Sequence, residues 1–227
     1  MRPLTDHTPK PLLQAGGKPL IVWHIERLVQ AGITDLIVNH AHLGEKIERE
    51  LGSGIQFGAH IRYSAEGSAL ETAGGIAFAL DLLGDEPFIV INGDVYCDYN
   101  IAQVSAKSDQ LKNKQDNAHL VLVNNPSHHP NGDFLLSEGR VLQTENQRQM
   151  TIGSQLTFSG IGLYQPTLFA HILRGSKTPL APLLREHIAL GKVSGEHYQG
   201  IWVDVGTPER LDQLDKNLRA TQNAIHV

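Results

Sequence analysis

The sequence has little cysteine and no long apolar run. Cys97 is the single cysteine among 227 residues, so no disulfide can form within the chain, as is usual in a reducing compartment. No stretch approaches the roughly 20 apolar residues that span a bilayer, and the first residues lack the apolar run of a signal peptide. We therefore expect a cytoplasmic protein without a membrane partner.

An excess of positive charge is also missing. The formal net charge is −5, which leaves no basic patch of the kind that binds nucleic acid. The hydrophobic content of 41% is ordinary for a folded globular protein. Because the chain shows no internal repeat and no low-complexity linker, we expect one domain over residues 1–227.

Short apolar segments alternate with segments of helical periodicity. The patterns predict strands near residues 33–40, 60–64, 87–94, 118–125 and 201–206, with antiparallel strands between Phe134 and Tyr164. They predict helices near residues 19–31, 43–52, 71–84, 166–173, 179–191 and 208–220. Such alternation predicts an α/β fold, with a mostly parallel sheet covered on both faces.

Lys10 lies between Pro9 and Pro11 near the start of the chain. A residue before proline is disfavoured in the helical region, so we expect Lys10 to be extended, with Pro9 stiffening the chain before it. A cation fixed in this way suits phosphate binding. The alternative is a solvated lysine in a proline-rich loop.

Two aspartates each follow an apolar strand. Asp94 comes after "FIVING" and Asp204 ends "IWVD", and open α/β sheets bind ligands at the carboxyl ends of their strands. Hard cations prefer oxygen ligands, so the pair predicts a Mg²⁺ site shared with phosphates. The alternative is two turn aspartates, since Thr207 could cap the following helix unaided.

The stretch "LETAGGI" places Glu71, Thr72, Gly74 and Gly75 at a helix start. Free backbone amides and the helix dipole favour an anion or a hydrogen-bonding ligand there. The alternative is a close helix-to-strand contact that requires small residues. The histidine pairs 40/42 and 128/129 lack the four-ligand spacing of a zinc site.

Three motifs occur together and in a fixed order: "RPLTDHTPKPLL", "NGD" and "WVDVGTPER". In this combination the chain resembles the sugar-1-phosphate nucleotidylyltransferases. The resemblance implies the nucleotide-diphospho-sugar transferase fold, a Rossmann-like three-layer sandwich. It also implies transfer of a nucleotidyl group from a nucleoside triphosphate to a sugar 1-phosphate, with pyrophosphate release and Mg²⁺ as cofactor.

The resemblance assigns roles to particular residues. It implies that Lys10 contacts the phosphates and that Asp94 and Asp204 bind Mg²⁺, these three forming the catalytic set. The remaining implied positions are nucleotide-binding Lys10, Glu71, Thr72 and Gly75, and sugar-binding Asn92, Asp133, Ser159 and Gly160.

Further segments narrow the substrate. The stretches "NHAHLGEKIERELG", "LETAGGI", "HHPNGDF" and "LTFSGI" are most similar to members that transfer a uridylyl group from UTP to N-acetylmuramate α-1-phosphate during peptidoglycan recycling. Guanylyl transfer to mannose 1-phosphate, another sugar 1-phosphate, and non-catalytic binding of a nucleotide sugar remain alternatives. We expect a monomer.

Members of the family begin with a strand and a glycine-rich turn ending in an arginine, ahead of the segment with which this chain starts. Met1 falls inside that motif. We therefore expect that the first strand of the fold is missing from the chain as written, and that its activity is doubtful without that strand.

Overall fold

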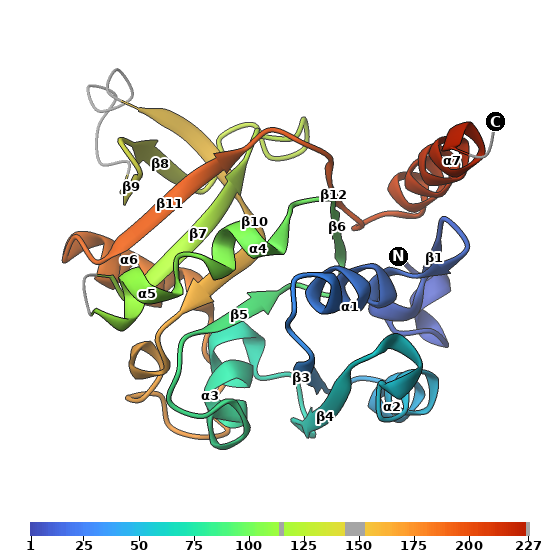
Figure 1. The fold of residues 1–227 in the computed structure, drawn as a ribbon, viewed down its shortest axis with the longest axis horizontal. Helices are drawn as coiled ribbons and strands as arrows, with labels where there is room; N and C mark the ends of the chain where they lie inside the picture. Colours follow the sequence, from blue (N-terminus) through green and yellow to red (C-terminus); the bar gives the residue numbers. More distant parts are fainter. Residues whose placement is uncertain (114–115, 144–152, 226–227) are drawn as a thin grey trace. The chain divides into compact units, whose positions relative to one another are not determined.

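The computed structural model describes residues 1–113, 116–143 and 153–225. The chain forms two compact units, each assembled from separated stretches (Figure 1). Unit 1 comprises Met1–Ser68, Asn92–Asp98 and Ile201–Val227, and unit 2 comprises Ala69–Ile91 and Tyr99–Gly200. The expected single domain over residues 1–227 stays a prediction.

Unit 1 contains several short strands and three α-helices within the described residues. In chain order its elements are η1 (Leu4–Asp6), η2 (Lys10–Leu12), β1 (Gln14–Ala15), β2 (Lys18–Pro19), α1 (Leu20–Gln30), β3 (Asp35–His40), α2 (Gly44–Leu51), η3 (Ile55–Phe57), β4 (His60–Ala65), β6 (Val95–Cys97), β12 (Trp202–Asp204) and α7 (Pro208–Ile225).

A strand–helix–strand crossover forms one core of unit 1. β3 and β4 pair in parallel along their length, and α2 supplies the crossover that parallel strands need. The apolar face of α1 carries Ile21 and Ile25, which are buried with Leu36 of β3 and Ile61 of β4. Pro19 directly precedes α1, so this helix begins where the sequence predicted.

A second core of unit 1 lies around β6 and β12. These strands are antiparallel, with Trp202 opposite Cys97 and Asp204 opposite Val95. α7 follows β12 and buries Leu214 in this core. The arrangement places the "NGD" segment, which directly precedes β6, beside the end of β12, which lies in the distant "WVDVG" segment.

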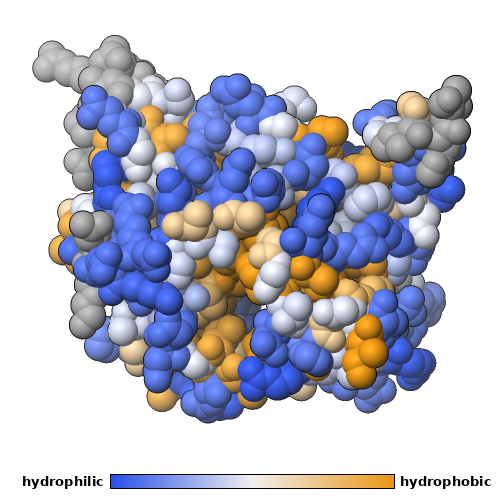
Figure 2. Space-filling model, in the orientation of Figure 1, coloured by the Kyte–Doolittle hydropathy of each residue, from blue (hydrophilic) through white to orange (hydrophobic). Residues whose placement is uncertain are grey.

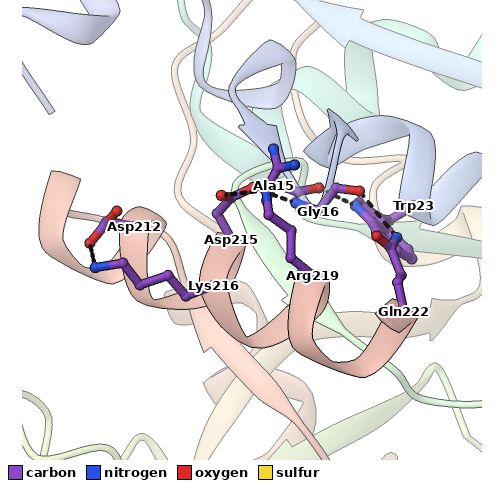
Figure 3. Close-up of polar contacts among 8 residues, drawn as sticks. All are labelled: Ala15, Gly16, Trp23, Asp212, Asp215, Lys216, Arg219 and Gln222. Carbon is purple, nitrogen blue, oxygen red and sulfur yellow. Dashed lines mark hydrogen bonds and ion pairs between the residues drawn. The ribbon is translucent and has the colours of Figure 1, made fainter. Parts of the chain in front are cut away.

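α7 also holds the hairpin of β1 and β2 (Figure 3). The hairpin turns at Gly16 and Gly17, whose φ angles of 61° and 85° lie in the left-handed region that glycine adopts without strain. The Asp215 carboxylate accepts the Gly16 amide at 2.8 Å, and the Gln222 amide donates to the Gly16 carbonyl at 3.1 Å. Both backbone groups of this glycine are therefore bound to α7.

Unit 2 contains a six-stranded sheet among its described residues, in the order β5-β10-β7-β11-β9-β8. In chain order its elements are α3 (Glu71–Leu83), β5 (Phe88–Ile91), α4 (Ile101–Ser105), α5 (Ser108–Lys112), β7 (Ala118–Val123), β8 (Phe134–Ser137), β9 (Arg140–Leu142), β10 (Ser154–Tyr164), η5 (Pro166–Leu168), α6 (Leu180–Ala189) and β11 (Val193–Tyr198).

The sheet of unit 2 is mixed, which corrects the expectation of a mostly parallel sheet. Among its described strands, only β7 and β11 pair in parallel, while β10 runs antiparallel to β5, β7 and β8. Strands buried on both faces have continuous apolar runs in either direction. The apolar pattern therefore predicted β5, β7 and the antiparallel strands β8, β9 and β10, but not that β10 also runs antiparallel to β5 and β7.

Two other segments differ from the predicted elements. Residues 166–173, expected to form a helix, contain only the short η5 followed by turns.

β11 was not expected, because Glu196 and His197 interrupt its apolar pattern. Its Gly195 amide donates to the Gly139 carbonyl at 3.0 Å, and a Cβ at this glycine would lie 2.7 Å from Val141 Cγ2. A close approach to a neighbouring segment thus explains the glycine within the strand.

One face of the unit 2 sheet packs against α3 and α6. Ala118, Leu120 and Leu122 alternate along β7 and are buried in one cluster with Ala73 of α3 and Leu184 of α6. This alternation is expected for a strand whose successive side chains point to opposite faces.

None of the described helices is long and apolar enough to cross a membrane. Hydrophilic residues cover much of the molecular face in Figure 2, with hydrophobic residues visible between them. Large exposed apolar side chains such as Ile55, Leu173 and Leu190 are ordinary when they occur singly.

Candidate functional site

Lys10 begins η2 and is not extended, contrary to the prediction. The Leu12 amide donates to the Pro9 carbonyl at 2.9 Å, and the Leu13 amide donates to the Lys10 carbonyl at 3.0 Å. The extended residue is Pro9, with ψ of 143°. Pro11 lies in the first turn of η2, where a backbone N–H would have no partner within the helix, so its absence costs no hydrogen bond. This favours the helical turn, although the residue before a proline ordinarily disfavours helical backbone angles.

The Lys10 ammonium lies 3.3 Å from Asp94 Oδ2, and these side chains are 40% and 39% exposed. Pro11 packs against the turn that carries Asp94, because a Cβ at Gly93 would lie 3.1 Å from Pro11 Cγ. The proline-rich turn and the "NGD" turn are therefore in contact. The lysine and the aspartate remain accessible to a ligand.

Asp94 and Asp204 lie at the same end of the β6–β12 ladder. Asp94 immediately precedes β6, Asp204 ends β12, and the Val205 amide donates to the Asp94 carbonyl at 3.0 Å. The structure thus brings together in unit 1 the three residues predicted to form the catalytic set.

Arg210 is a fourth charged residue at this place, and the sequence analysis missed it. Its Nη1 lies 2.8 Å from Asp204 Oδ2, with side chains 28% and 33% exposed. The Thr207 hydroxyl accepts the Arg210 amide at 3.3 Å, so Thr207 caps α7 as the alternative interpretation proposed. Asp204 is therefore not needed as the helix cap. The sequence did offer one indication of Arg210: it is a cation in the first turn of the predicted helix that follows "DVG", close in sequence to Asp204.

His24 of α1 was also missed. It is buried, and its Nε2 lies 2.7 Å from the Val95 carbonyl, one residue after Asp94. Burial lowers the pKa of His24 from 6.5 to about 4, so the imidazole is neutral near pH 7 and donates to this carbonyl. Its contact fixes the start of β6 beside the candidate site.

The two aspartates fit a divalent cation that is shared with a ligand. Within residues 1–113, 116–143 and 153–225, no group of three or more His, Cys, Asp or Glu residues is arranged to hold a metal ion. Mg²⁺ is usually held by one or two carboxylates together with water and substrate phosphates, rather than by an all-protein cage. Asp94 and Asp204 have the hard oxygen donors that such an arrangement requires.

The predicted nucleotide-binding residues Glu71, Thr72 and Gly75 lie at the start of α3 in unit 2. Glu71 has a left-handed φ of 61°, which is uncommon for a residue other than glycine. The Gly74 amide donates to the Thr178 carbonyl at 3.0 Å. A Cβ at Gly74 would lie 2.3 Å from the Ser176 carbonyl oxygen, so this glycine makes a close contact, although with the segment before α6 and not with a strand as the alternative interpretation expected.

Three of the predicted sugar-binding residues also lie in unit 2. Asp133 accepts the Phe158 amide at 2.8 Å, and its other oxygen lies 3.1 Å from His129 Nε2. It lines a cavity of about 450 Å³ together with Gly132, Gln155 and Arg185.

Ser159 is fully buried in β10. Its hydroxyl donates to the Val121 carbonyl at 2.7 Å and accepts the Ile161 amide at 3.1 Å. Gly160 has φ of 82°, at the irregularity between Phe158 and Ile161. Asn92, the fourth predicted sugar-binding residue, is half-buried in unit 1, beside Gly93.

The sequence profile described as nucleotidyl transferase matches residues 1–221. The chain belongs to the nucleotidyl transferase family. It is 49% identical to the N-acetylmuramate α-1-phosphate uridylyltransferase of Neisseria meningitidis serogroup B, over 94% of this chain and 90% of that protein. It is 30% identical to the catalytic subunit β of mannose-1-phosphate guanylyltransferase of Danio rerio, over 92% of this chain and 58% of that protein.

Solved structures show the fold of this nucleotidyl transferase. A Bacillus anthracis protein assigned as a glucose-1-phosphate thymidylyltransferase superposes with a TM-score of 0.79. The match covers 96% of this chain and 90% of that one, at 22% identity. The likeness shows that the two chains share a fold.

Proposed function

We propose that this nucleotidyl transferase moves a uridylyl group from UTP to N-acetylmuramate α-1-phosphate, forming UDP-N-acetylmuramate and pyrophosphate. The main observation that supports the proposal is that Lys10, Asp94 and Asp204 lie close together in unit 1. The high identity to the Neisseria meningitidis uridylyltransferase supports the choice of substrates.

The proposed reaction requires no side-chain nucleophile. An oxygen of the sugar phosphate attacks the α-phosphorus of UTP, and the bond from that phosphorus to the β-phosphate oxygen breaks. The attacking oxygen is already anionic, so no general base is needed. The difficulty is to bring two polyanions together, which fixed cations accomplish by positioning and charge neutralisation.

Lys10 supplies such a fixed cation on a turn held by Pro9 and Pro11. Asp94 and Asp204 would hold Mg²⁺, which neutralises phosphate charge when bound. The strands β6 and β12 are paired, and the Val205 amide donates to the Asp94 carbonyl, so the backbone at both aspartates is held in place before a substrate binds.

The remaining assignments belong to the same proposal. Glu71, Thr72 and Gly75 bind the nucleotide, and Asn92, Asp133 and Gly160 bind the sugar. The Ser159 hydroxyl is buried and donates to the backbone, so it does not contact the sugar. Ser159 instead contributes to sugar binding by holding the backbone of β10 in place. We further propose a cytoplasmic monomer that serves peptidoglycan recycling.

The test is pyrophosphate release from UTP and N-acetylmuramate α-1-phosphate with and without Mg²⁺. It uses this chain and a form extended upstream in its reading frame. Lys10→Gln should lower kcat/KM by about a hundredfold or more, the effect expected when a charge-stabilising group is removed. Asp94→Asn and Asp204→Asn should abolish the Mg²⁺ response, whereas Asp212→Asn on the exposed side of α7 should not.

Guanylyl transfer to mannose 1-phosphate is the second candidate, favoured by the 30% identity to the Danio rerio enzyme subunit. The same assay with GTP and mannose 1-phosphate separates the two, because a base pocket that forms hydrogen bonds discriminates strongly. Turnover with GTP alone would reject the uridylyl assignment. Binding of UDP-sugars without turnover in either form would reject transfer altogether.

A further inference from the structure

Both carboxylates of the candidate site are already paired with a cation. Lys10 Nζ lies 3.3 Å from Asp94 Oδ2, and Arg210 Nη1 lies 2.8 Å from Asp204 Oδ2. All four residues belong to unit 1. Their charges sum to zero, so a divalent cation arriving alone meets no net attraction from this group.

Gly206 provides the space for the second pair. A Cβ at this position would lie 2.3 Å from Arg210 Nη2 and 3.3 Å from Asp204 Oδ2. The φ of Gly206 is not in the left-handed region, so the backbone conformation does not require glycine. The glycine of "DVGTPER" is therefore explained by the guanidinium that lies over it.

We propose that Arg210 is a positioning residue that occupies Asp204 in the absence of nucleotide, so that the divalent cation enters together with the triphosphate. This rests on the proposed function, which assigns the carboxylates to the cation and Lys10 to the phosphates. The triphosphate attracts Lys10 away from Asp94 and adds negative charge beside Arg210. Both carboxylates then become available to the cation that the nucleotide carries.

Two independent substitutions remove the Arg210–Asp204 contact. Arg210→Gln removes the charge, and Gly206→Ala displaces the guanidinium while keeping it on the chain. The clash in Gly206→Ala is with the ends of two flexible side chains, closely with Arg210 and less closely with Asp204, so the fold should accept the change. Lys216→Gln is the matched control, because Lys216 pairs with exposed Asp212 on the same helix.

The experiment measures Mn²⁺ binding to the full chain by electron paramagnetic resonance, without nucleotide and then with UTP. Without nucleotide, Arg210→Gln and Gly206→Ala should each bind Mn²⁺ about fivefold or more tightly than the unchanged chain. The double variant should match the single ones, because both changes remove one interaction. Lys216→Gln and the charge-conserving Arg210→Lys should stay within about twofold of the unchanged chain.

Addition of UTP gives the second readout. It should increase Mn²⁺ affinity more in the unchanged chain than in Arg210→Gln, because only the former must release the guanidinium. Unchanged or weaker Mn²⁺ binding in both single variants would overturn the proposal, as would additive effects in the double variant. Thermal unfolding confirms that every variant is folded.

The outcome is separable from that of the proposed function. Mn²⁺ binding requires no sugar phosphate and no turnover, so the expected pattern would support the role of Arg210 even if uridylyl transfer failed. Conversely, the chain could catalyse uridylyl transfer while its Mn²⁺ affinity does not depend on Arg210. That result would support the proposed function and reject this role of Arg210. Asp204→Asn should abolish the difference between the Arg210 variants.

Discussion

At the scale of single residues, buried His24 joins the helix α1 to the strand that begins beside Asp94. Its Nε2 lies 2.7 Å from the Val95 carbonyl, and burial lowers its pKa to about 4. The unfolded chain therefore binds a proton at this histidine near pH 6.5, whereas the folded chain does not until about pH 4. The free energy of unfolding therefore carries no penalty from His24 above about pH 6.5, and it decreases as the pH falls from about 6.5 to about 4.

We predict that His24→Gln reduces this acid sensitivity, because a glutamine amide can donate to the Val95 carbonyl but does not titrate. With His24 unchanged, the free energy of unfolding should fall by about 3 kcal/mol at pH 4, because each unit of pKa difference is worth about 1.4 kcal/mol. Urea unfolding between pH 4 and pH 8 measures it. The lowered pKa values of His119 and His187 act in the same direction and persist in the variant. An unchanged pH profile in His24→Gln would contradict the prediction.

Glu71 has a strained backbone conformation, with a φ of 61° at the first residue of α3. We predict that Glu71→Gly raises the free energy of unfolding by about 0.5–1 kcal/mol, because glycine adopts this region at little cost. Loss of the exposed pair with Lys177, at 3.6 Å, subtracts little. Glu71→Ala is the control: it keeps the strain, so in urea unfolding it should be less stable than Glu71→Gly. The reverse order would show that φ at this residue does not limit stability.

At the scale of elements, the α7 helix binds the turn between β1 and β2 through one particular carboxylate (Figure 3). Asp215 accepts the Gly16 amide at 2.8 Å and pairs with Arg219, whereas Asp212 pairs with Lys216 at 2.6 Å near the surface. We predict that Asp215→Ala lowers the free energy of unfolding by about 1–2 kcal/mol, since the amide of buried Gly16 loses its acceptor.

The matched substitution Asp212→Ala should cost about 0.5 kcal/mol or less, because its partner is exposed on the same helix. Chemical denaturation of the two variants provides the comparison. Equal effects would mean that the bond to Gly16 adds no stability. Arg219 and the Gly16 amide also lower the pKa of Asp215, so its contribution is present above the ordinary aspartate pKa and is lost as the pH falls below it.

The elements show which structural features were predictable from sequence. The helical spacing of apolar residues predicted α1 and α7, and the sequence also marks their starts, with Pro19 just before α1 and Pro208 at the first position of α7. The antiparallel direction of β8, β9 and β10 was predicted. The mixed character of the whole sheet was not, because it depends on pairing between distant segments such as β7 and β10. β11 was missed because its polar residues and Gly195 conceal a strand pattern.

The candidate site was predictable only where motifs marked it. Lys10, Asp94 and Asp204 each follow or lie within a recognisable local pattern, and the structure places them together in unit 1. Arg210 and His24 carry no such pattern, because their importance comes from partners that folding alone brings close. The conformation of Lys10 was mispredicted because two turn hydrogen bonds outweigh a local preference.

At the scale of the whole molecule, Asp94 and Asp204 are separated by more than a hundred residues, and each joins unit 1 from a different stretch of chain. A ligand that binds both carboxylates therefore stabilises a folded arrangement that the unfolded chain cannot provide. By mass action, a ligand at a hundred times its dissociation constant adds about 2.7 kcal/mol to the free energy of unfolding.

We predict that UTP with Mg²⁺ raises the Tm of the chain, and that UTP without Mg²⁺ raises it less. Asp94→Asn and Asp204→Asn should lose most of the Mg²⁺-dependent increase. Their ligand-free Tm should change little, because both carboxylates are partly exposed. Thermal unfolding with UTP and with GTP tests this directly. An equal increase with GTP would contradict selection of the uracil base, and an unchanged response in both aspartate variants would show that the triphosphate binds elsewhere.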